Sequence, residues 1–338
     1  MAPLTLRRVV SVTLLLALVL VGVAVVSLRL GAVSISTHGL GSCLVAAASG
    51  RTEYVTTDCR MIVLGLRLPR MLLALLVGGA LSVAGAGFQA LLRNPLADPY
   101  VLGVSSGAAL GAIFALLAQP RTSLATMGAA FAGALLTVAA VYFLGRRGGQ
   151  LDSFTLLLAG VITASFFSAV IMFLLASLPG RDLRGMAFWL MGDLSSPLPV
   201  RLAWLFLVTL LAMGAVYSTS ADLNLLAGGE QEAMHLGVNV GRVKVVVYLA
   251  GSLLTALAVS VSGAIGYIGL LVPHVMRMLF GSDYRLLIPA SALGGAIALI
   301  IADTLARTVV APTELPVGAM TAIAGAPVFI YLLRRRMG

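Results

Sequence analysis

Charged residues are scarce in this sequence. Only 10% of the 338 residues are Asp, Glu, Lys or Arg, whereas 60% are hydrophobic. A chain with so little polar surface cannot cover a water-soluble globule. A helix needs about 20 mostly apolar residues to cross a membrane, so this length permits roughly eight to ten crossings. The composition therefore predicts an all-α polytopic membrane protein with little room for a soluble domain.

Lysine and histidine are also rare. The sole lysine, Lys244, follows Val243, so no GxxxxGKS or GxxxxGKT loop exists and the chain cannot itself be a P-loop ATPase. His38, His235 and His274 lie far apart without HExxH-like spacing, which predicts ordinary loop or helix-end residues and no metal site. No cluster of catalytic groups is present. A membrane-embedded enzyme is therefore disfavoured, and no cofactor is expected in this chain.

The formal net charge of +10 does not indicate a nucleic-acid partner. The 22 Lys and Arg residues are dispersed and lie mainly between apolar runs, where membrane proteins carry their basic residues. We therefore expect no nucleic acid among the partners.

The sequence contains only two cysteines, Cys43 and Cys59, and both fall in the polar connection after the first apolar run. A metal site would need more ligands than these. Two interpretations remain open: one disulfide, if the connection faces an oxidising compartment, or two unlinked thiols.

Long apolar runs dominate what is present. The first, Val9 to Leu28, follows Arg7 and Arg8 as a signal peptide would. It exceeds a typical h-region of about 7 to 15 residues and lacks a clear cleavage site, so we interpret it as a retained helix. About ten membrane helices are predicted, near residues 9–29, 68–91, 101–118, 124–144, 154–178, 200–218, 244–262, 266–280, 286–306 and 317–333.

The predicted helices suggest an orientation. The last run ends in Arg334 to Arg336, and a basic cluster beside a final helix favours the cytoplasm. Ten crossings return the chain to the side where it began, so both termini are predicted to be cytoplasmic. Asn94–Pro95 and Pro273–His274 are predicted to interrupt apolar segments, which is tolerated where protein shields the backbone or a cavity lies beside it.

The sequence leaves more than one interpretation for the charged residues near helix ends. In this topology Arg67 and Arg70 stand at the outer mouth of one helix, where they either attract an acidic partner or extend to lipid headgroups. Asp303 precedes Arg307 by four residues, and such a pair is expected to neutralise itself near the membrane boundary. The alternative functional class, an ion-coupled secondary transporter, would need an essential intramembrane acid, for which Asp303 is the candidate.

The most informative polar segment runs from Ser218 to Arg242. Apolar residues alternate with Asp222, Glu230 and Glu232 around a Gly228–Gly229 break, a pattern that predicts two short amphipathic helices. Helices of this kind lie on a membrane or dock into a groove on a partner. On the cytoplasmic side they would transmit force from a soluble motor.

Several long motifs resemble the FecCD family of permeases, which includes vitamin B12, haem and ferric-siderophore importers. The first, from Arg67 to Ala112, reads RLPRMLLALLVGGALSVAGAGFQALLRNPLADPYVLGVSSGAALGA. Later motifs that agree are LNLLAGGEQEAMHLGVNV, SGAIGYIGLLVPHVMR, ADTLART and ELPVGAMTAIAGAPVFIYLL. The resemblance implies the type II ABC importer permease fold, with one transmembrane domain over residues 1–338 and a cytoplasmic coupling segment at residues 219–243.

The resemblance also implies an assembly in the bacterial inner membrane. It comprises two copies of this chain, two ATPase subunits that bind ATP and Mg, and one periplasmic or lipid-anchored binding protein. The cargo would be an iron chelate (siderophore or haem) or cobalamin, passing along the interface between the two permeases. No tight substrate site is expected in this subunit alone.

Site residues follow from the same resemblance, motif by motif. The residues implied in docking the binding protein are Arg67, Arg70 and Arg307. The residues implied in contacting the ATPase are Asn224, Leu225, Leu226, Gly229, Glu230, Ala233, Leu236 and Gly237. The residues implied in the cytoplasmic gate are Asn94, Pro95, Leu96, Asp152 and Ser153. An aspartate at position 152 departs from the family's pair of small hydroxyl residues, and the loop with Cys43 and Cys59 lies outside the family signature.

Overall fold

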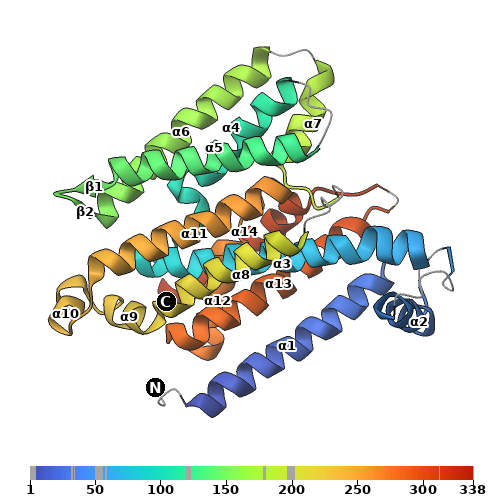
Figure 1. Cartoon of the computed structure of the whole chain (residues 1–338), viewed down its shortest axis with the longest axis horizontal. Helices are drawn as coiled ribbons and strands as arrows, with labels where there is room; N and C mark the ends of the chain where they lie inside the picture. Colours follow the sequence, from blue (N-terminus) through green and yellow to red (C-terminus); the bar gives the residue numbers. More distant parts are fainter. Residues whose placement is uncertain are drawn as a thin grey trace.

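The computed structural model describes residues 5–31, 33, 35–49, 56–57, 59–118, 123–177, 180–195, 202–311 and 313–337. Within these residues the chain is an all-helical bundle with one two-stranded hairpin (Figure 1). Each apolar run predicted from the sequence corresponds to a helix. These helices are α1 (Leu6–Arg29), α3 (Leu68–Leu91), α4 (Val104–Leu117), α5 (Ser123–Leu144), α6 (Ser153–Ser177), α8 (Leu202–Ser218), α11 (Val240–Ser262), α12 (Ile268–Phe280), α13 (Tyr284–Thr308) and α14 (Val317–Met337).

The lengths of these helices fit a membrane protein. In the described part of the chain, 6 helices are long and apolar enough to cross a membrane, and there are 7 if α8 and the following α9, which are bent by 47° at the break between them, count as one span. The helices α4, α12 and α14 are apolar but shorter. The predicted all-α polytopic fold is therefore confirmed.

Short elements join the long helices, and most of them were not predicted. Outside the predicted coupling segment they are α2 (Thr37–Ala48), the π-helix η2 (Cys59–Arg67), the 3-10 helix η3 (Pro99–Leu102), β1 (Arg146–Arg147), β2 (Gln150–Leu151) and α7 (Gly180–Leu190). Residues 219–243 do contain the two expected short helices, α9 (Ser220–Leu226) and α10 (Glu230–His235).

The bundle has two distinct ends. Figure 1 shows α9, α10 and the β1–β2 hairpin at one end, and α2 and α7 at the other. The first turn of α1 lies toward the end that carries α10, because the Arg8 guanidinium donates to the Phe280 carbonyl at the end of α12 (3.0 Å). We call these the α10 end and the α2 end.

Helix α3 lies at the centre of the bundle and packs against α11, α12 and α13. Glycines allow this close approach. A Cβ atom on Gly85 would collide with the backbone of Gly269 in α12, and one on Gly78 would collide with the backbone of Gly295 in α13. Membrane helices gain contact area when small residues let their backbones meet. Gly78 and Gly85 of α3 therefore serve close helix packing.

The chain breaks between α11 and α12, in the gap between the predicted helices at residues 244–262 and 266–280. Gly263 and Tyr267 both have positive φ (66° and 69°) and enclose the break. The Tyr100 hydroxyl accepts from the Ile265 amide (2.9 Å) and donates to its carbonyl (3.0 Å), so protein groups satisfy the exposed backbone. The interruption predicted at Pro273–His274 is wrong, because α12 continues through both residues. His274 is therefore a buried helical residue and not a loop or helix-end residue.

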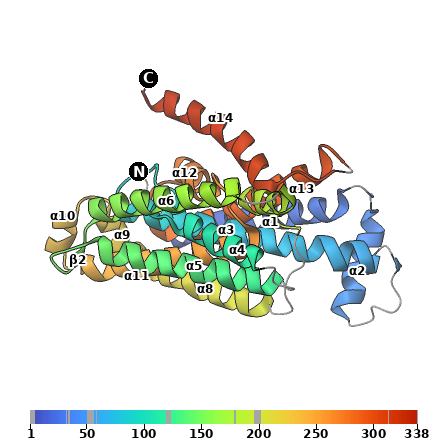
Figure 2. The same cartoon turned by 90° about the horizontal axis from the view of Figure 1, so that it is seen from above.

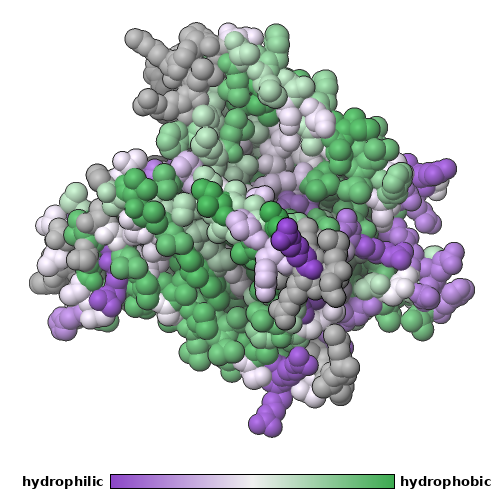
Figure 3. Space-filling view, turned by 180° about the vertical axis from the view of Figure 1, so that it is seen from behind, coloured by the Kyte–Doolittle hydropathy of each residue, from purple (hydrophilic) through white to green (hydrophobic). Residues whose placement is uncertain are grey.

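The outer surface is mainly apolar. Figure 3 shows broad hydrophobic areas on one face, with hydrophilic residues at the right and left edges, at the bottom and at one place near the centre. Figure 2 shows that α14 leaves the bundle and projects away from it. Several of its apolar side chains are exposed, among them Ile323, Ile330 and Tyr331.

Candidate functional site

The turn that follows α3 is held in a tight conformation. Arg93 adopts a positive φ of 49°, and the next amide, that of Asn94, donates to the Gln89 carbonyl (3.1 Å). The Asn94 side chain then accepts from the Leu96 amide (2.9 Å). A non-glycine residue in the left-handed region is strained, and its surroundings must enforce it. This gate turn (residues 92–97) therefore has a defined shape, with Leu96 exposed at its tip.

The second predicted gate element meets the gate turn. The Ser153 hydroxyl donates to the Leu91 carbonyl at the end of α3 (3.0 Å). Ser153 is the first residue of α6 and follows the β1–β2 hairpin directly. The structure thus brings together the two segments whose residues were assigned to a gate, although they are about sixty positions apart.

Asp152 has a local explanation. Its carboxylate accepts from the Thr155 amide (2.8 Å) and from the Thr155 hydroxyl (2.6 Å), so it caps the N-terminus of α6. These hydrogen bonds lower the pKa of the Asp152 carboxyl below its usual value. An aspartate at this place therefore secures the start of α6, which a small hydroxyl residue would also do.

The coupling segment has an inner side that attaches it to the bundle. Leu226 and Ala233 are buried. Asn224 faces inward as well, since it donates to Asp283 (2.8 Å) and accepts from the Tyr284 amide (2.8 Å) at the start of α13. Hydrogen bonds from Arg285 contribute most to lowering the pKa of Asp283 to about 2, so its carboxylate is ionised at neutral pH. Asn224, Leu226 and Ala233 thus fix α9 and α10 to the body.

The outer side of the same segment presents apolar side chains to the surroundings. Leu225, Met234 and Leu236 are exposed, the last by 67%. Gly237 is exposed too and has a positive φ of 87°, which suits glycine at the end of α10. A short helix with apolar residues on its free side is typical of a docking element. Of the predicted coupling residues, Leu225, Leu236 and Gly237 are therefore the exposed ones, and their contact with an ATPase stays a prediction.

The three arginines assigned to docking lie together at the α2 end, with their guanidinium groups turned inward. Arg67 is buried and donates to the carbonyls of Leu28 (2.8 Å), Arg29 (3.1 Å) and Val33. It thereby ties the end of α1 to the start of α3. The docking role stays a prediction, and the structure gives Arg67 a packing role in addition.

Asp303 is the centre of an ion-pair cluster. It accepts from Arg70 (2.7 Å) on one oxygen and from Arg307 (3.0 Å) on the other, and its side chain is only 2% exposed. Arg70 also pairs with Glu314 (2.6 Å), which is 49% exposed. The sequence predicted only the Asp303–Arg307 pair. A buried carboxylate that both guanidinium groups hold by hydrogen bonds joins α3 to α13 and so suits a structural anchor.

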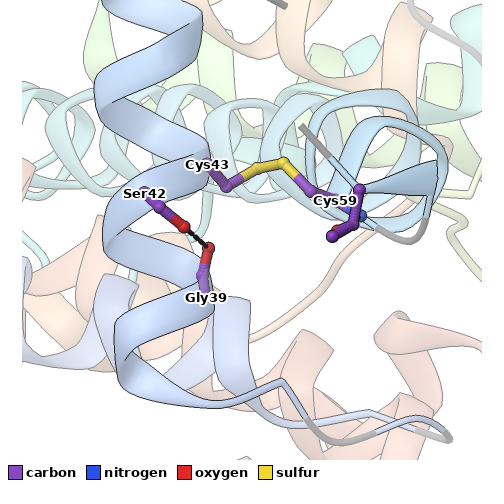
Figure 4. Close-up of a disulfide and its surroundings, with 5 residues drawn as sticks. Gly39, Ser42, Cys43 and Cys59 are labelled. Carbon is purple, nitrogen blue, oxygen red and sulfur yellow. Dashed lines mark hydrogen bonds between the residues drawn. A yellow bond between two sulfur atoms is a disulfide. The ribbon is translucent and has the colours of Figure 1, made fainter. Parts of the chain in front are cut away.

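The two cysteines are joined in the structure. A disulfide links Cys43 in α2 to Cys59 at the start of η2, with Cα atoms 5.8 Å apart (Figure 4). The Ser42 hydroxyl donates to the Gly39 carbonyl (3.0 Å) on the preceding turn of α2. Both cysteines are buried, in the same hydrophobic cluster as Leu40 and Val63. The bond therefore fastens α2 to the helix that leads into α3.

One further polar residue at the α10 end was not among the predicted site residues. Lys244 is buried in α11, and its ammonium group donates to Glu230 (2.7 Å) and to the Leu151 carbonyl (3.2 Å). The sequence did carry a signal, because a lysine within an apolar helix needs a nearby acceptor. We used Lys244 only to exclude a P-loop and did not predict its contacts. Among the described residues, no group of three or more His, Cys, Asp or Glu could hold a metal.

Comparison with known proteins identifies the family. The sequence model of the FecCD transport family matches residues 14–335. The chain belongs to this family. It is 39% identical to the cobalamin import system permease protein BtuC of Halobacterium salinarum over 99% of this chain and 90% of that protein. It is 43% identical to the hemin transport system permease protein HmuU of Yersinia pestis over 81% of this chain and 83% of that protein.

A solved structure agrees with the sequence comparisons. It is an inward-facing ABC transporter assigned to the metal-chelate type, with a TM-score of 0.81 and 31% sequence identity over 96% of this chain and 99% of that one. This FecCD protein is therefore a multi-pass membrane permease of an ABC importer and not an enzyme. The gate turn, the residues Asp152 and Ser153 after the hairpin, and the coupling segment are parts of the permease that the sequence motifs had marked.

Proposed function

We propose that this FecCD protein is the permease subunit of an ATP-driven type II importer. The observation that carries the proposal is the arrangement at the α10 end. There, a coupling segment with exposed Leu225 and Leu236 lies at the same end of the bundle as the gate turn and the hairpin. A soluble ATPase that binds this surface would act close to the gate turn. Its movement would therefore reach the gate turn through few intervening residues.

The complete transporter would contain two copies of this chain, two ATPase subunits that bind ATP and Mg, and a binding protein. Two exposed apolar surfaces support a second copy and lipid as neighbours. Helix α6 exposes Ile162, Phe166 and Phe173, and α14 projects with Ile323 and Ile330 exposed. Apolar surfaces of this extent require lipid or protein cover.

The proposed orientation places the α10 end in the cytoplasm. Both ends of the described chain then face the cytoplasm, since α1 begins and α14 ends toward the α10 end. The α2 end, with Arg67, Arg70, Arg307 and the disulfide, then faces the periplasm. There the binding protein would dock, and disulfides persist in that compartment.

The cargo that we propose is a metal chelate, either an iron chelate (siderophore or haem) or cobalamin. Support comes from the relatives, which are named for cobalamin and hemin, and from the metal-chelate type of the solved structure. Ion-coupled transport receives no support from the site. Its candidate acid, Asp303, is engaged by Arg70 and Arg307 together.

The test is uptake into proteoliposomes that contain this chain with its ATPase and binding protein. Haem, ferric siderophores and cobalamin are offered in turn. We expect uptake of one of these chelates that stops when ATP, the ATPase or the binding protein is omitted. Uptake driven by an ion gradient without the ATPase would overturn the proposal.

A further inference from the structure

Lys244 occupies a buried position where three elements meet. Lys244 is 5% exposed and lies one turn into α11. The ammonium group reaches Glu230, the first residue of α10, and the Leu151 carbonyl, the last residue of β2. Burying an ammonium group is costly unless charged and hydrogen-bonding partners surround it. Helix α10 and the hairpin are therefore both bound to α11 through one atom.

The contact continues from the hairpin to the gate turn. Leu151 is followed by Asp152, which caps α6, and by Ser153, whose hydroxyl donates to the Leu91 carbonyl. Leu91 is the last residue of α3, and the gate turn begins beside it. An uninterrupted series of hydrogen bonds and short chain segments thus leads from α10 through Lys244 to residues 92–97.

The attachment of α10 to the bundle is small apart from this pair. Helix α10 has only 6 residues, of which Ala233 alone is buried. Glu230 has a side chain 32% exposed, so it lies between the docking surface and the buried lysine. When α10 moves, its ion pair with Lys244 must either move the hairpin or break.

The hairpin side is held to α11 by a second contact. Tyr248, one turn beyond Lys244, donates its hydroxyl to the Val138 carbonyl of α5 (2.8 Å). The Tyr142 ring of α5 lies 5.9 Å from the Tyr248 ring, and the Arg146 guanidinium of the hairpin stands 5.5 Å above Tyr142. One face of α11 thus holds α5, the hairpin and the start of α6 as a unit.

We propose that Lys244 is a positioning residue that passes the displacement of α10 to the hairpin and the gate turn. The inference rests on the proposed function, since it assumes that an ATPase moves α10. It adds the residue through which that movement reaches the gate. Lys244 touches no cargo. Its role is to keep Glu230 and Leu151 at a fixed separation while the ATPase changes state.

The first test compares variants of the complete transporter in proteoliposomes. Lys244→Met keeps a long side chain but removes the charge and the donor, and Glu230→Gln removes the other charge. We expect cargo imported per ATP to fall about tenfold in both variants, within the range of energetic coupling between sites, and Lys244→Met to hydrolyse ATP at close to the normal rate. The double variant should lose no more than either single variant, because both break the same contact.

Two further variants separate coupling from folding. Lys244→Arg retains the charge and donors, so it should restore most of the import per ATP. Arg285→Gln is the matched control, because it removes an exposed ion pair with Asp283 at the same end of the molecule. It should behave as the wild type. Unchanged import per ATP in Lys244→Met, or equal losses in Arg285→Gln, would overturn the inference.

The second test uses the full chain without its partners and so does not depend on the proposed function. Spin labels are placed at Gln150→Cys in the hairpin and Gln231→Cys in α10, both exposed. The two native cysteines are linked to each other and need not be removed. Lys244→Met should broaden the distance distribution between the labels, whereas Arg285→Gln should not.

The two tests fail in different ways. An unchanged distance distribution in Lys244→Met overturns the role of Lys244, whatever the transporter carries. A broadened distribution in Lys244→Met together with absent ATP-driven uptake in the wild type supports the role of the Glu230–Lys244 contact and overturns the proposed function instead.

Discussion

At the scale of single residues, Asp152 shows how one side chain can depart from a family pattern without disturbing the fold. The family resemblance led us to expect a small hydroxyl residue. The carboxylate instead caps α6 through Thr155. Serine, threonine, aspartate and asparagine are all good N-cap residues because each presents an oxygen acceptor. The position therefore demands an acceptor and not a particular residue.

This reasoning gives a prediction for Asp152. Asp152→Ala should destabilise the protein by about 1 kcal/mol through loss of the cap, whereas Asp152→Asn should cost much less. Thermal unfolding of the purified variants measures both. Equal losses in the two variants would show that the charge matters and not the cap.

The wild-type cap should also depend on pH. Because folding lowers the pKa of Asp152, its stabilisation is present above the usual carboxyl pKa and is lost as pH falls through the lower folded value. Thermal unfolding temperatures of the wild type and Asp152→Asn should therefore converge at acid pH. A constant difference between them down to low pH would contradict this.

Asp303 is the residue for which the structure changed the expectation most. Its pairing with Arg70, which lies far away in the sequence, could not be read from an i,i+4 pattern. Asp303→Asn leaves two largely buried guanidinium groups without their common counter-ion. Loss of one partner of a buried pair costs about 3–5 kcal/mol, so we expect a large fall in thermal stability.

Glu314→Gln provides the control for Asp303. It removes the ion pair that Arg70 makes with a half-exposed carboxylate, and such pairs contribute about 0–1 kcal/mol. If Asp303→Asn retained wild-type stability but lost transport, Asp303 would be a functional acid, as an ion-coupled carrier requires.

At the scale of elements, the contact between α3 and α12 depends on two glycines, Gly85 and Gly269, whose backbones pack directly against each other. Gly85→Ala would drive a methyl group into the backbone of Gly269, which cannot move aside as a flexible side chain could. We expect a loss of about 1–3 kcal/mol, measured by thermal unfolding in detergent.

Gly214→Ala in α8 is the matched control for Gly85→Ala, since a Cβ there meets nothing within 4 Å. It should be neutral or slightly stabilising, because alanine favours helix more than glycine does. Equal destabilisation in both variants would mean that the α3–α12 contact is not the cause of the effect.

The sequence predicted the long helices well because a membrane leaves one strong signal, an apolar run of spanning length. The same signal cannot detect α2, α7 or the hairpin, which are short and do not span. It placed the break between residues 262 and 266 correctly, but the proline led us to expect a further interruption at Pro273–His274 that α12 does not have. Proline at 273 is tolerated inside the helix, whereas the real break depends on Gly263, on the positive φ of Tyr267 and on the distant Tyr100 hydroxyl.

The candidate site was predictable to a similar degree. Motif resemblance marked the gate turn and the coupling segment. It could not tell which side chains of the segment turn inward, since Asn224 and Leu225 are neighbours with opposite environments. The Glu230–Lys244 contact was missed because it depends on how α10 folds back onto α11.

At the scale of the whole molecule, the α10 end is expected to be the ATPase-binding surface. Leu236→Glu places a charge on its most exposed apolar residue among those assigned to coupling. We expect the variant to fold normally and to lose most of its co-purification with the ATPase, because buried charge in an apolar contact is unfavourable.

Leu279→Glu is the control for Leu236→Glu. It alters an exposed leucine near the end of α12, outside the coupling segment. It should retain the ATPase. If both variants, or neither, lost the ATPase, the coupling segment would not be the binding surface.

The disulfide at the α2 end has a consequence for how the protein is made. Cys43 and Cys59 lie between the first two long helices, and in the proposed orientation they oxidise only after this segment has been exported from the reducing cytoplasm. The disulfide in each finished molecule then shows that its first two long helices were inserted in the proposed orientation. A molecule inserted in the opposite orientation would keep two free thiols, so titrating thiols in the purified, unfolded protein would measure the fraction that was inserted wrongly.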